Sequence, residues 1–423
     1  MNGHRVVLYL RENSTNYEFN TNIRTIDGIE LPKNWTTKVI KWPRFWTQFG
    51  LSLEMFLHPV DALFIPAHTV PCIHPARNVS LFSLAIFIQK FLKTLGISTY
   101  YNQHSAAGGP TNTIVTIHGL EYEFCPEAYS FWERLYMRST IKSSCRWAKK
   151  IIAVSENTKK DLMKLYKVQE EKIEVIYEGY ENNNQQPVIS NQKNTEKENS
   201  YELRVTSYGR YLLFVGRLEE RKNVVGIIKS FEILKERYKI PHKLILVGKP
   251  GFGYEKIKNE IANVNCVKDI IETGFVSAEE KNYLLNNADV FVFPTLYEGF
   301  GLPILEAQNA GVPVVASNNS SIEEITSLPF SPQMRRDVPQ GQRGYEKNER
   351  ENLLFNSPPQ LRRGELESAI LIDPNNAEDI ADAVYKILSD EKTKQDLIQK
   401  GLENIQRFSW EKCGKEIAEI LKK

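Results

Sequence analysis

The sequence VFVFPTLYEGFGLPILEA runs from Val290 to Ala307 and consists of an apolar run, a glycine-containing turn and the start of a helical pattern. Its first four residues are apolar throughout, which is typical of a strand buried in a parallel sheet. Gly299 and Gly301 then allow a tight turn, and Pro303 suits the first turn of a helix. This strand–turn–helix pattern predicts one βα unit of an α/β fold.

The same alternation recurs on both sides of this unit. In the second half the other apolar runs are LLFV (212–215), LILV (244–247) and PVVA (313–316). In the first half they are VVLYL (6–10), ALFI (62–65), TIVTI (113–117), IIAV (151–154) and IEVI (173–176). Helical patterns lie between them, for example at 127–147, 156–166 and 224–238. Since 423 residues exceed one ordinary core, we predict two Rossmann-like, doubly wound α/β domains facing across a cleft.

Domain boundaries follow from composition. We assign residues 1–181 to an N-terminal domain, 182–207 to a polar linker, 208–400 to a C-terminal domain and 401–423 to a C-terminal helix. The linker cannot bury enough apolar surface to order itself. Two stretches fit the pattern poorly: 76–109, an extra segment of the first domain, and 327–367, whose five prolines and weak periodicity indicate an insertion.

Bulk composition indicates a soluble globular protein, with 41% hydrophobic and 25% charged residues. The net charge of +2 gives no reason to expect a nucleic-acid partner. Five scattered cysteines without a CxxC pair favour reduced thiols over disulfides or a zinc site: Cys72, Cys125, Cys145, Cys266 and Cys413. We therefore expect a cytoplasmic protein.

Membrane insertion is not expected. The N-terminus lacks the pattern of a signal peptide, and the longest apolar run, Val79 to Leu92, is interrupted by Gln89 and Lys90. That run is shorter than the ~20 residues of a membrane-spanning helix. It fits a helix packed on the protein better than one lying on a membrane, although peripheral association at the inner face of a membrane stays open.

The loop within the opening sequence has the features of a ligand site. Glu298 and Glu306 are separated by seven residues, and the two glycines between them let the backbone approach a ligand closely. The free N–H groups of the following helix would face a phosphate. Glu306 can bind a vicinal diol such as a ribose. A glycine turn with two surface glutamates is the alternative interpretation.

Two further segments end strands of the predicted sheets. VGRLEERKN (215–223) supplies Arg217 and Lys222, whose cations would offset the charge that builds on a departing diphosphate. Alone, both would more often be solvated residues. TIVTIHG (113–119) leaves His118 at a strand end, where a structural role is the alternative to a functional one.

Other patterns exclude competing chemistry. GKPGFG (248–253) lacks the last glycine of a dinucleotide fingerprint, so we interpret it as a turn and set an oxidoreductase aside. No Asp-x-Asp pair occurs in the chain, so no metal site for a diphosphate is predicted. SENTKKDL (155–162) and SAEE (277–280) are typical helix caps, the second a capping box.

Taken together, the motifs resemble those of glycosyltransferase family four, a group of retaining enzymes with the two-domain GT-B fold. The matching segments are TIHGLEYEFCPEAYS, KKIIAVSENTKKDL, LLFVGRLEERKN, ADVFVFPTLYEGFGLPILEA, GVPVVASN and ILIDPNNAEDIADAV. They span most of residues 32–388. The nearest resemblance is to mannosyl- and glucosyltransferases of bacterial surface polysaccharides. Members of the family begin with a strand and a glycine-rich loop that this chain lacks ahead of VVLYL.

This resemblance implies roles for individual residues. Glu298 and the backbone of Phe300, Gly301 and Leu302 would hold the sugar and diphosphate, Glu306 the ribose, and Arg217 with Lys222 the diphosphate. Gly216 and Gly299 complete the implied donor site, and His118 would contact the transferred sugar. The catalytic set is thus Glu298, His118, Arg217 and Lys222.

The implied reaction transfers a hexose from GDP-mannose or a UDP-hexose to a glycan or lipid-linked acceptor, without a metal or other cofactor. The N-terminal domain would bind the acceptor and the C-terminal domain the donor. Two alternatives stay open: another GT-B enzyme, such as a nucleotide-sugar epimerase, and a non-catalytic or weakly active protein that only binds nucleotide sugars.

Overall fold

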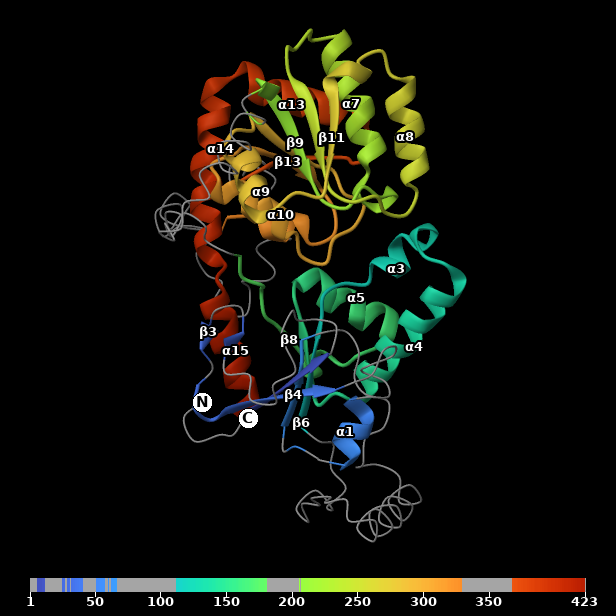
Figure 1. Cartoon of the computed structure of the whole chain (residues 1–423), viewed down its shortest axis with the longest axis vertical. Helices are drawn as coiled ribbons and strands as arrows, with labels where there is room; N and C mark the ends of the chain where they lie inside the picture. The colour runs from blue at the N-terminus through green and yellow to red at the C-terminus, as the bar shows by residue number, and fades with distance from the viewer. Residues whose placement is uncertain are drawn as a thin grey trace, which may run out of the picture.

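The computed structural model describes residues 6–11, 25–26, 29–30, 32–40, 51–57, 60, 62–66, 112–180, 205, 207–328 and 367–422. They form two α/β domains, one above the other in Figure 1. The predicted segment 76–109 lies outside the described residues. So do 329–366 of the predicted insertion and, apart from Val205 and Ser207, the predicted linker.

The upper, C-terminal domain is built on a six-stranded parallel sheet. Its strands are β9 (Tyr211–Val215), β10 (Lys243–Val247), β11 (Ile270–Gly274), β12 (Val290–Phe293), β13 (Val314–Ser317) and β14 (Ile370–Ile372). The spatial order is β11-β10-β9-β12-β13-β14. Chain order therefore reverses direction between β9 and β12, and doubly wound sheets bind ligands at such a switch point.

Helices cover both faces of this sheet and bury its apolar strands. They are α7 (Val224–Glu236), α8 (Tyr254–Asn263), α9 (Ala278–Asn286), α10 (Leu302–Asn309), α11 (Ile322–Thr326), α13 (Ala377–Ser389) and α14 (Glu391–Asn404). One apolar side of α7, including Ile227, Ile228 and Phe231, faces the core, as its periodicity predicts. Ser277 caps α9 by accepting a hydrogen bond from the Glu280 N–H.

The lower, N-terminal domain contains a four-stranded parallel sheet in the order β5-β6-β7-β8. Its strands are β5 (Ala62–Ile65), β6 (Asn112–Ile117), β7 (Lys150–Ala153) and β8 (Ile173–Val175). A separate parallel pair joins β1 (Val6–Arg11) to β4 (Trp35–Ile40), and β2 (Thr25–Ile26) pairs with β3 (Ile29–Glu30).

The helices of this domain are α1 (Ser52–Leu57), α3 (Glu121–Phe124), α4 (Phe131–Trp147) and α5 (Glu156–Tyr166). The bounds of α5 match the prediction, and Ser155 caps it. The helix predicted at 127–147 begins later, because Ser130 and Glu133 form a capping box behind a short 3-10 turn, Pro126–Ala128.

The C-terminal residues return to the lower domain, where α15 (Trp410–Lys422) runs down its side in Figure 1. Cys413, Ile417 and Ile420 of this helix pack on Ile114 and Ile152 of the lower sheet. The single helix predicted over 401–423 is wrong. The chain leaves α14 at Asn404, forms the 3-10 turn Ile405–Arg407, and buries Phe408 before α15 starts.

The two ends of the predicted insertion lie side by side. Ser327 and Glu367 form an antiparallel bridge, and the Ser368 N–H donates to the Thr326 carbonyl at 2.9 Å. The Ser368 hydroxyl donates to the same carbonyl at 2.8 Å. These residues are therefore part of the folded domain, and an insertion would have to begin after Ser327 and end before Glu367.

Deleting 329–366 and joining Leu328 to Glu367 through two or three small residues should leave the fold intact. Loop length contributes only about 0.6 kcal/mol per doubling, so the melting temperature should stay within about 3 °C of the full chain. Differential scanning calorimetry checks this. A matched deletion that also removes Ser327 and Glu367 should melt lower. Failure of the first variant to fold would make the segment part of the core.

Candidate functional site

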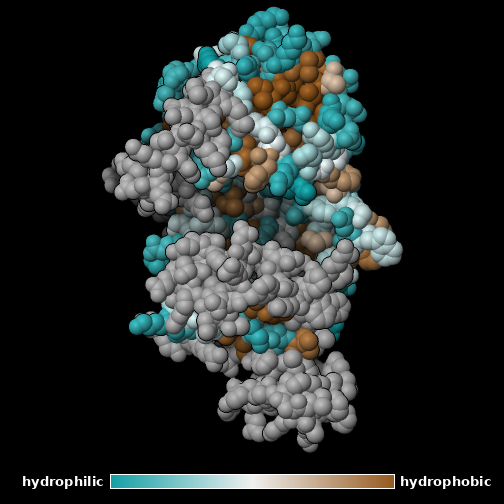
Figure 2. Space-filling view, in the orientation of Figure 1, coloured by the Kyte–Doolittle hydropathy of each residue, from teal (hydrophilic) through white to brown (hydrophobic). Residues whose placement is uncertain are grey.

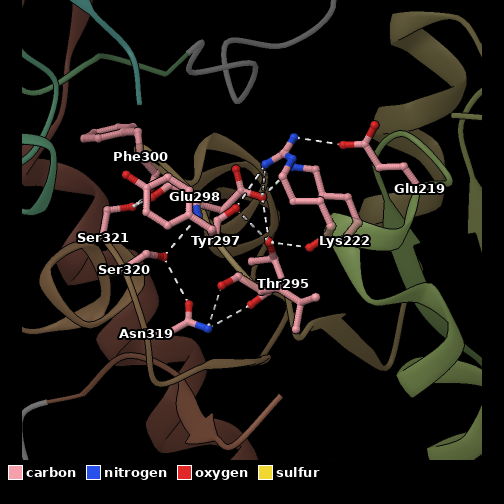
Figure 3. Close-up of polar contacts among 11 residues, drawn as sticks. Glu219, Lys222, Thr295, Tyr297, Glu298, Phe300, Asn319, Ser320 and Ser321 are labelled. Carbon is pink, nitrogen blue, oxygen red and sulfur yellow. Dashed lines mark hydrogen bonds and ion pairs between the residues drawn. The ribbon is translucent and has the colours of Figure 1, made fainter. Parts of the chain in front are cut away.

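Two strand ends meet at the switch point of the upper sheet. Strands β9 and β12 are hydrogen-bonded neighbours, with Leu212 opposite Val290. The chain leaves β9 into Gly216–Lys222 and leaves β12 into Pro294–Gly301, so both predicted motifs lie at one edge (Figure 3). The sequence therefore placed the two motifs correctly relative to each other.

Glu298 is buried at the centre of this edge. Its Oε1 accepts hydrogen bonds from Lys222 Nζ at 2.5 Å and from Thr295 Oγ1 at 2.9 Å. Burial alone would raise the pKa of this carboxyl. The positive charges of Lys222 and Arg221 outweigh that effect and hold its pKa below the ordinary value, so Glu298 is an anion at neutral pH.

Arg221 is a second cation of the site that sequence reasoning missed. Its guanidinium donates to the Tyr297 carbonyl at 3.0 Å and to Glu219 Oε1 at 2.9 Å, and it lies 3.4 Å from Glu298 Oε1. Burial lowers its pKa, but Glu298 and Glu219 raise it by more, so it stays charged. The only sequence signal is its place directly before Lys222 in ERKN.

The segment after β13 holds the loop in shape. Asn319 donates to the carbonyls of Thr295 and Leu296, at 3.2 and 3.1 Å. The Glu298 N–H donates to Ser320 Oγ at 3.0 Å, and the Ser321 hydroxyl donates to the Glu298 carbonyl at 3.0 Å. Figure 3 shows these three side chains below the loop. Their signal in the sequence is the polar run NNSS after a buried strand, which we did not single out.

Helix α10 begins at the end of the same loop. Gly301 precedes it with φ +121°, a conformation that side-chain-bearing residues rarely adopt, and Leu302 is its first residue. The Phe300 ring points away into a small core with Tyr177 and Phe408. Glu306, further along the helix, is half-buried and pairs with Lys281 at 2.8 Å. The helix start thus offers backbone N–H groups beside Glu298.

Arg217 lies apart from this cluster. Its side chain is exposed and makes no ion pair within the described part of the chain. Gly216 before it touches Gly248 of the GKPGFG segment, since a Cβ on Gly248 would come within 1.8 Å of the Gly216 carbonyl oxygen. That segment is a loop between β10 and α8, paired with the Arg217 loop through the Gly251 N–H and the Leu218 carbonyl at 2.9 Å.

His118 reaches the site through its main chain. It follows β6 in the lower domain, and a Cβ on Gly299 would lie 1.6 Å from the His118 carbonyl oxygen. Its imidazole nitrogens contact Glu178 Oε1 at 2.6 Å and the Pro66 carbonyl at 2.8 Å. The hydrogen bond to Glu178 raises the pKa of His118, which favours the imidazolium form.

The geometry can therefore bind an anionic ligand that also offers hydroxyl groups. Comparison with known sequences identifies the class of protein. The profile described as "Glycosyltransferase Family 4" matches residues 1–183, and the profile described as "Glycosyl transferases group 1" matches residues 195–328. The chain belongs to glycosyltransferase family 4. It is thus a glycosyltransferase, as the motifs predict.

Two curated mannosyltransferases are similar over half of the chain or more. O-antigen chain mannosyltransferase B of Escherichia coli is 25% identical over 307 residues, which cover 71% of this glycosyltransferase and 67% of the relative. O-antigen chain mannosyltransferase RfbU of Salmonella typhimurium is 27% identical over 214 residues, which cover 51% and 54%. The chain thus spans about half of the second relative.

Solved structures confirm the two-domain GT-B fold. Anabaena HepE, in complex with UDP and glucose, superposes with a TM-score of 0.56 at 16% identity, covering 92% of this chain and 86% of that protein. Sucrose-phosphate synthase of Thermosynechococcus elongatus gives 0.59 at 18% identity, covering 99% and 89%. In the described residues of this glycosyltransferase, no helix has the length and apolar character to cross a membrane.

Changing Gly299 to alanine should disrupt the contact between the domains. The added Cβ would overlap the His118 carbonyl, which is backbone and can move only if the domains shift. We expect a loss of about 1–3 kcal/mol in the free energy of unfolding, as for overpacking elsewhere, measured by urea denaturation. The control is Gly414→Ala on α15, where a Cβ meets nothing within 4 Å and helix propensity gains up to ~1 kcal/mol. Equal stability of Gly299→Ala and wild type would contradict the close approach.

Proposed function

We propose that this glycosyltransferase moves a hexose of the mannose or glucose class from GDP-mannose or a UDP-hexose to a glycan or lipid-linked acceptor, with retention of anomeric configuration. The observation that carries the proposal is the buried Glu298, paired with two cations at the start of α10. Two similar relatives are named O-antigen chain mannosyltransferases, which supports surface-polysaccharide synthesis as the setting.

The charges of the site suit a donor that carries both phosphate and sugar. Arg221 and Lys222 contribute two positive charges, and Glu219 and Glu298 two negative charges, so the cluster is close to neutral by itself. A sugar hydroxyl that donates a hydrogen bond to Glu298 would replace Lys222 as a partner of the carboxylate. Lys222 would then turn toward the diphosphate, whose other partners are the exposed Arg217 and the backbone N–H groups of Phe300, Gly301 and Leu302.

The remaining donor contacts follow the same chemistry. Glu306, half-exposed and within reach of Lys281, would accept hydrogen bonds from the ribose hydroxyls. Gly216 and Gly299 would let the backbone approach the diphosphate without a side chain intervening. His118, whose imidazolium form Glu178 favours, would exchange its contact with the Pro66 carbonyl for a hydrogen bond donated from Nε2 to the transferred sugar.

Transfer proceeds on one face of the sugar in this proposal. The bond from the anomeric carbon to the β-phosphate oxygen breaks, and the acceptor hydroxyl oxygen bonds to the same carbon. The acceptor proton passes to the departing phosphate oxygen, leaving a nucleoside diphosphate and a glycosylated acceptor. Lys222 and Arg217 stabilise the negative charge that grows on the phosphate. This electrostatic stabilisation is strongest where water is excluded. Glu298 is not the nucleophile in this proposal, because the acceptor oxygen bonds directly to the anomeric carbon and no covalent enzyme intermediate forms.

Isothermal titration of the full chain with GDP and with UDP tests the donor site. One of them should bind with micromolar to millimolar affinity, and EDTA should not change that affinity, since the proposed contacts use no metal. Lys222→Ala should lower kcat about a hundredfold, the typical effect of removing one such group, and weaken diphosphate binding less.

The matched control is Lys229→Ala, an exposed lysine on α7 away from the loop, which should behave as wild type. Strict dependence on magnesium would contradict the site. Binding without any transfer would favour a non-catalytic protein, and conversion of the donor sugar without an acceptor would favour an epimerase.

We further propose that the protein binds a membrane surface through one side of α4. Phe131 and Trp132 are 70% and 74% exposed, and Lys142 and Arg146 lie exposed on the same side, about three and four turns further along the helix. Hydrophobic and hydrophilic residues alternate at the protruding right edge of the lower domain in Figure 2, where α3 and α4 lie in Figure 1. Exposed aromatic residues beside cations are typical of interfacial helices on anionic lipid.

Changing Phe131 and Trp132 together to serine should weaken binding to vesicles of phosphatidylcholine with phosphatidylglycerol by about tenfold or more, because the apolar contact with the acyl region is lost. Co-sedimentation measures this. Phe275→Ser is the control, since Phe275 is 73% exposed on the upper domain. Equal binding of all three proteins, or none by wild type, would contradict this surface.

A further inference from the structure

Tyr297, directly before Glu298, is bound by the opposite domain. Its ring stacks on Phe124 of α3, with centroids 4.5 Å apart and planes 9° from parallel. Its hydroxyl donates to Asp161 Oδ2 of α5 at 2.7 Å. Phe124 and Asp161 belong to the lower domain, whereas Tyr297 belongs to the loop between β12 and α10 of the upper domain. The contact therefore exists only while the domains are together.

Asp161 is a buried carboxylate that the proposed transfer chemistry does not use. It also accepts a hydrogen bond from Asn157 Nδ2 at 3.0 Å, and among the described residues no lysine or arginine forms an ion pair with it. Burial, the largest influence on its pKa, raises the pKa above the ordinary value. A carboxylate in such a place is costly unless hydrogen bonds satisfy it. The Tyr297 hydroxyl supplies one of them from across the interface.

Gly299, which directly follows Glu298, is also bound by the lower domain. The Ser155 hydroxyl, at the start of α5, donates to the Gly299 carbonyl at 2.7 Å. The main chain of Glu298 itself is bound within the upper domain by Ser320 and Ser321. One domain thus fixes the peptide of Glu298, and the other fixes both of its neighbours.

We propose that Tyr297 and Asp161 form an interdomain latch, and that Tyr297 is a positioning residue for the transfer. This inference rests on the proposed function. The diphosphate contacts lie within the upper domain, so a nucleoside diphosphate binds whether the latch is made or not. The latch fixes Glu298 against the sugar only in the closed arrangement, so it affects turnover and leaves diphosphate binding largely unchanged.

Tyr297→Phe tests the latch, because it keeps the ring on Phe124 and removes only the hydroxyl. We expect kcat with GDP-mannose or UDP-glucose to fall about tenfold, as for loss of a hydrogen bond to a charged group. The dissociation constant for GDP or UDP should change less than about twofold. Asp161→Asn should lower kcat by a similar factor, and the double variant should be no worse than the poorer single one, since both remove the same interaction.

Tyr211→Phe is the matched control. The Tyr211 hydroxyl is buried and donates to the Leu284 carbonyl at 2.7 Å, within the upper domain. Its loss should lower the melting temperature, and it should not lower kcat more than it weakens diphosphate binding. Wild-type kcat in Tyr297→Phe, equal losses of kcat and diphosphate affinity, or additive effects of the two latch variants would each overturn the latch.

If wild type neither binds a nucleoside diphosphate nor transfers a sugar, the proposed function is wrong. Small-angle scattering then tests independently whether the Tyr297–Asp161 contact holds the domains together. Tyr297→Phe should then show a larger radius of gyration than wild type and Tyr211→Phe. An unchanged radius would overturn the latch.

Discussion

A carboxylate buried away from water stays ionised only where positive charges and hydrogen-bond donors stabilise it. Without them, it takes up a proton. Glu298 meets this requirement through Lys222, Arg221 and Thr295. Lys222 and Arg221 follow β9, whereas Glu298 and Thr295 follow β12, so the ion pairs tie two strand ends together at the switch point of the sheet. The loop that carries Glu298 then has a defined path into α10.

The rest of the upper domain supports this arrangement. The segment after β13 binds the backbone of the same loop through Asn319, Ser320 and Ser321, so the third neighbouring strand end also takes part. The helix start brings N–H groups to the same place without a side chain at Gly301. A charged group, a free helix end and a rigid backbone together suit a ligand whose phosphate and hydroxyl groups must be held at a fixed separation.

Contact with the lower domain completes the site. Gly299 lies against the His118 carbonyl, and Ser155 hydrogen-bonds the backbone at the same residue. The C-terminal helix α15 leaves the upper domain and packs on the lower sheet, which adds a second covalent crossing between the domains. The protein therefore has a site whose geometry depends on how the two domains meet, and this suits a reaction that needs both binding of a donor and exclusion of water.

The sequence by itself determined most of the helices and strands and placed the two motifs of the candidate site at strand ends. Apolar runs such as 290–293 and the capped helix at 156–166 appear with the predicted bounds, because burial and capping are local properties of the chain. Glu298 and Lys222 were each predicted to follow a strand of the second domain, and the carboxyl ends of parallel strands lie at one edge of the sheet. The break between α14 and α15 was missed, because it depends on where Phe408 is buried between the domains.

Only the tertiary structure decided which side chains touch. Arg221 was not singled out beside Lys222, and Tyr297 and Asp161 lie 136 positions apart in the chain. Arg217 and Lys222 were predicted to act together, yet Lys222 is buried against Glu298 and Arg217 is exposed. Periodicity and motif spacing describe one segment at a time. The orientation of a side chain at a strand end depends on the charges that other segments bring to it, and the fold alone supplies those.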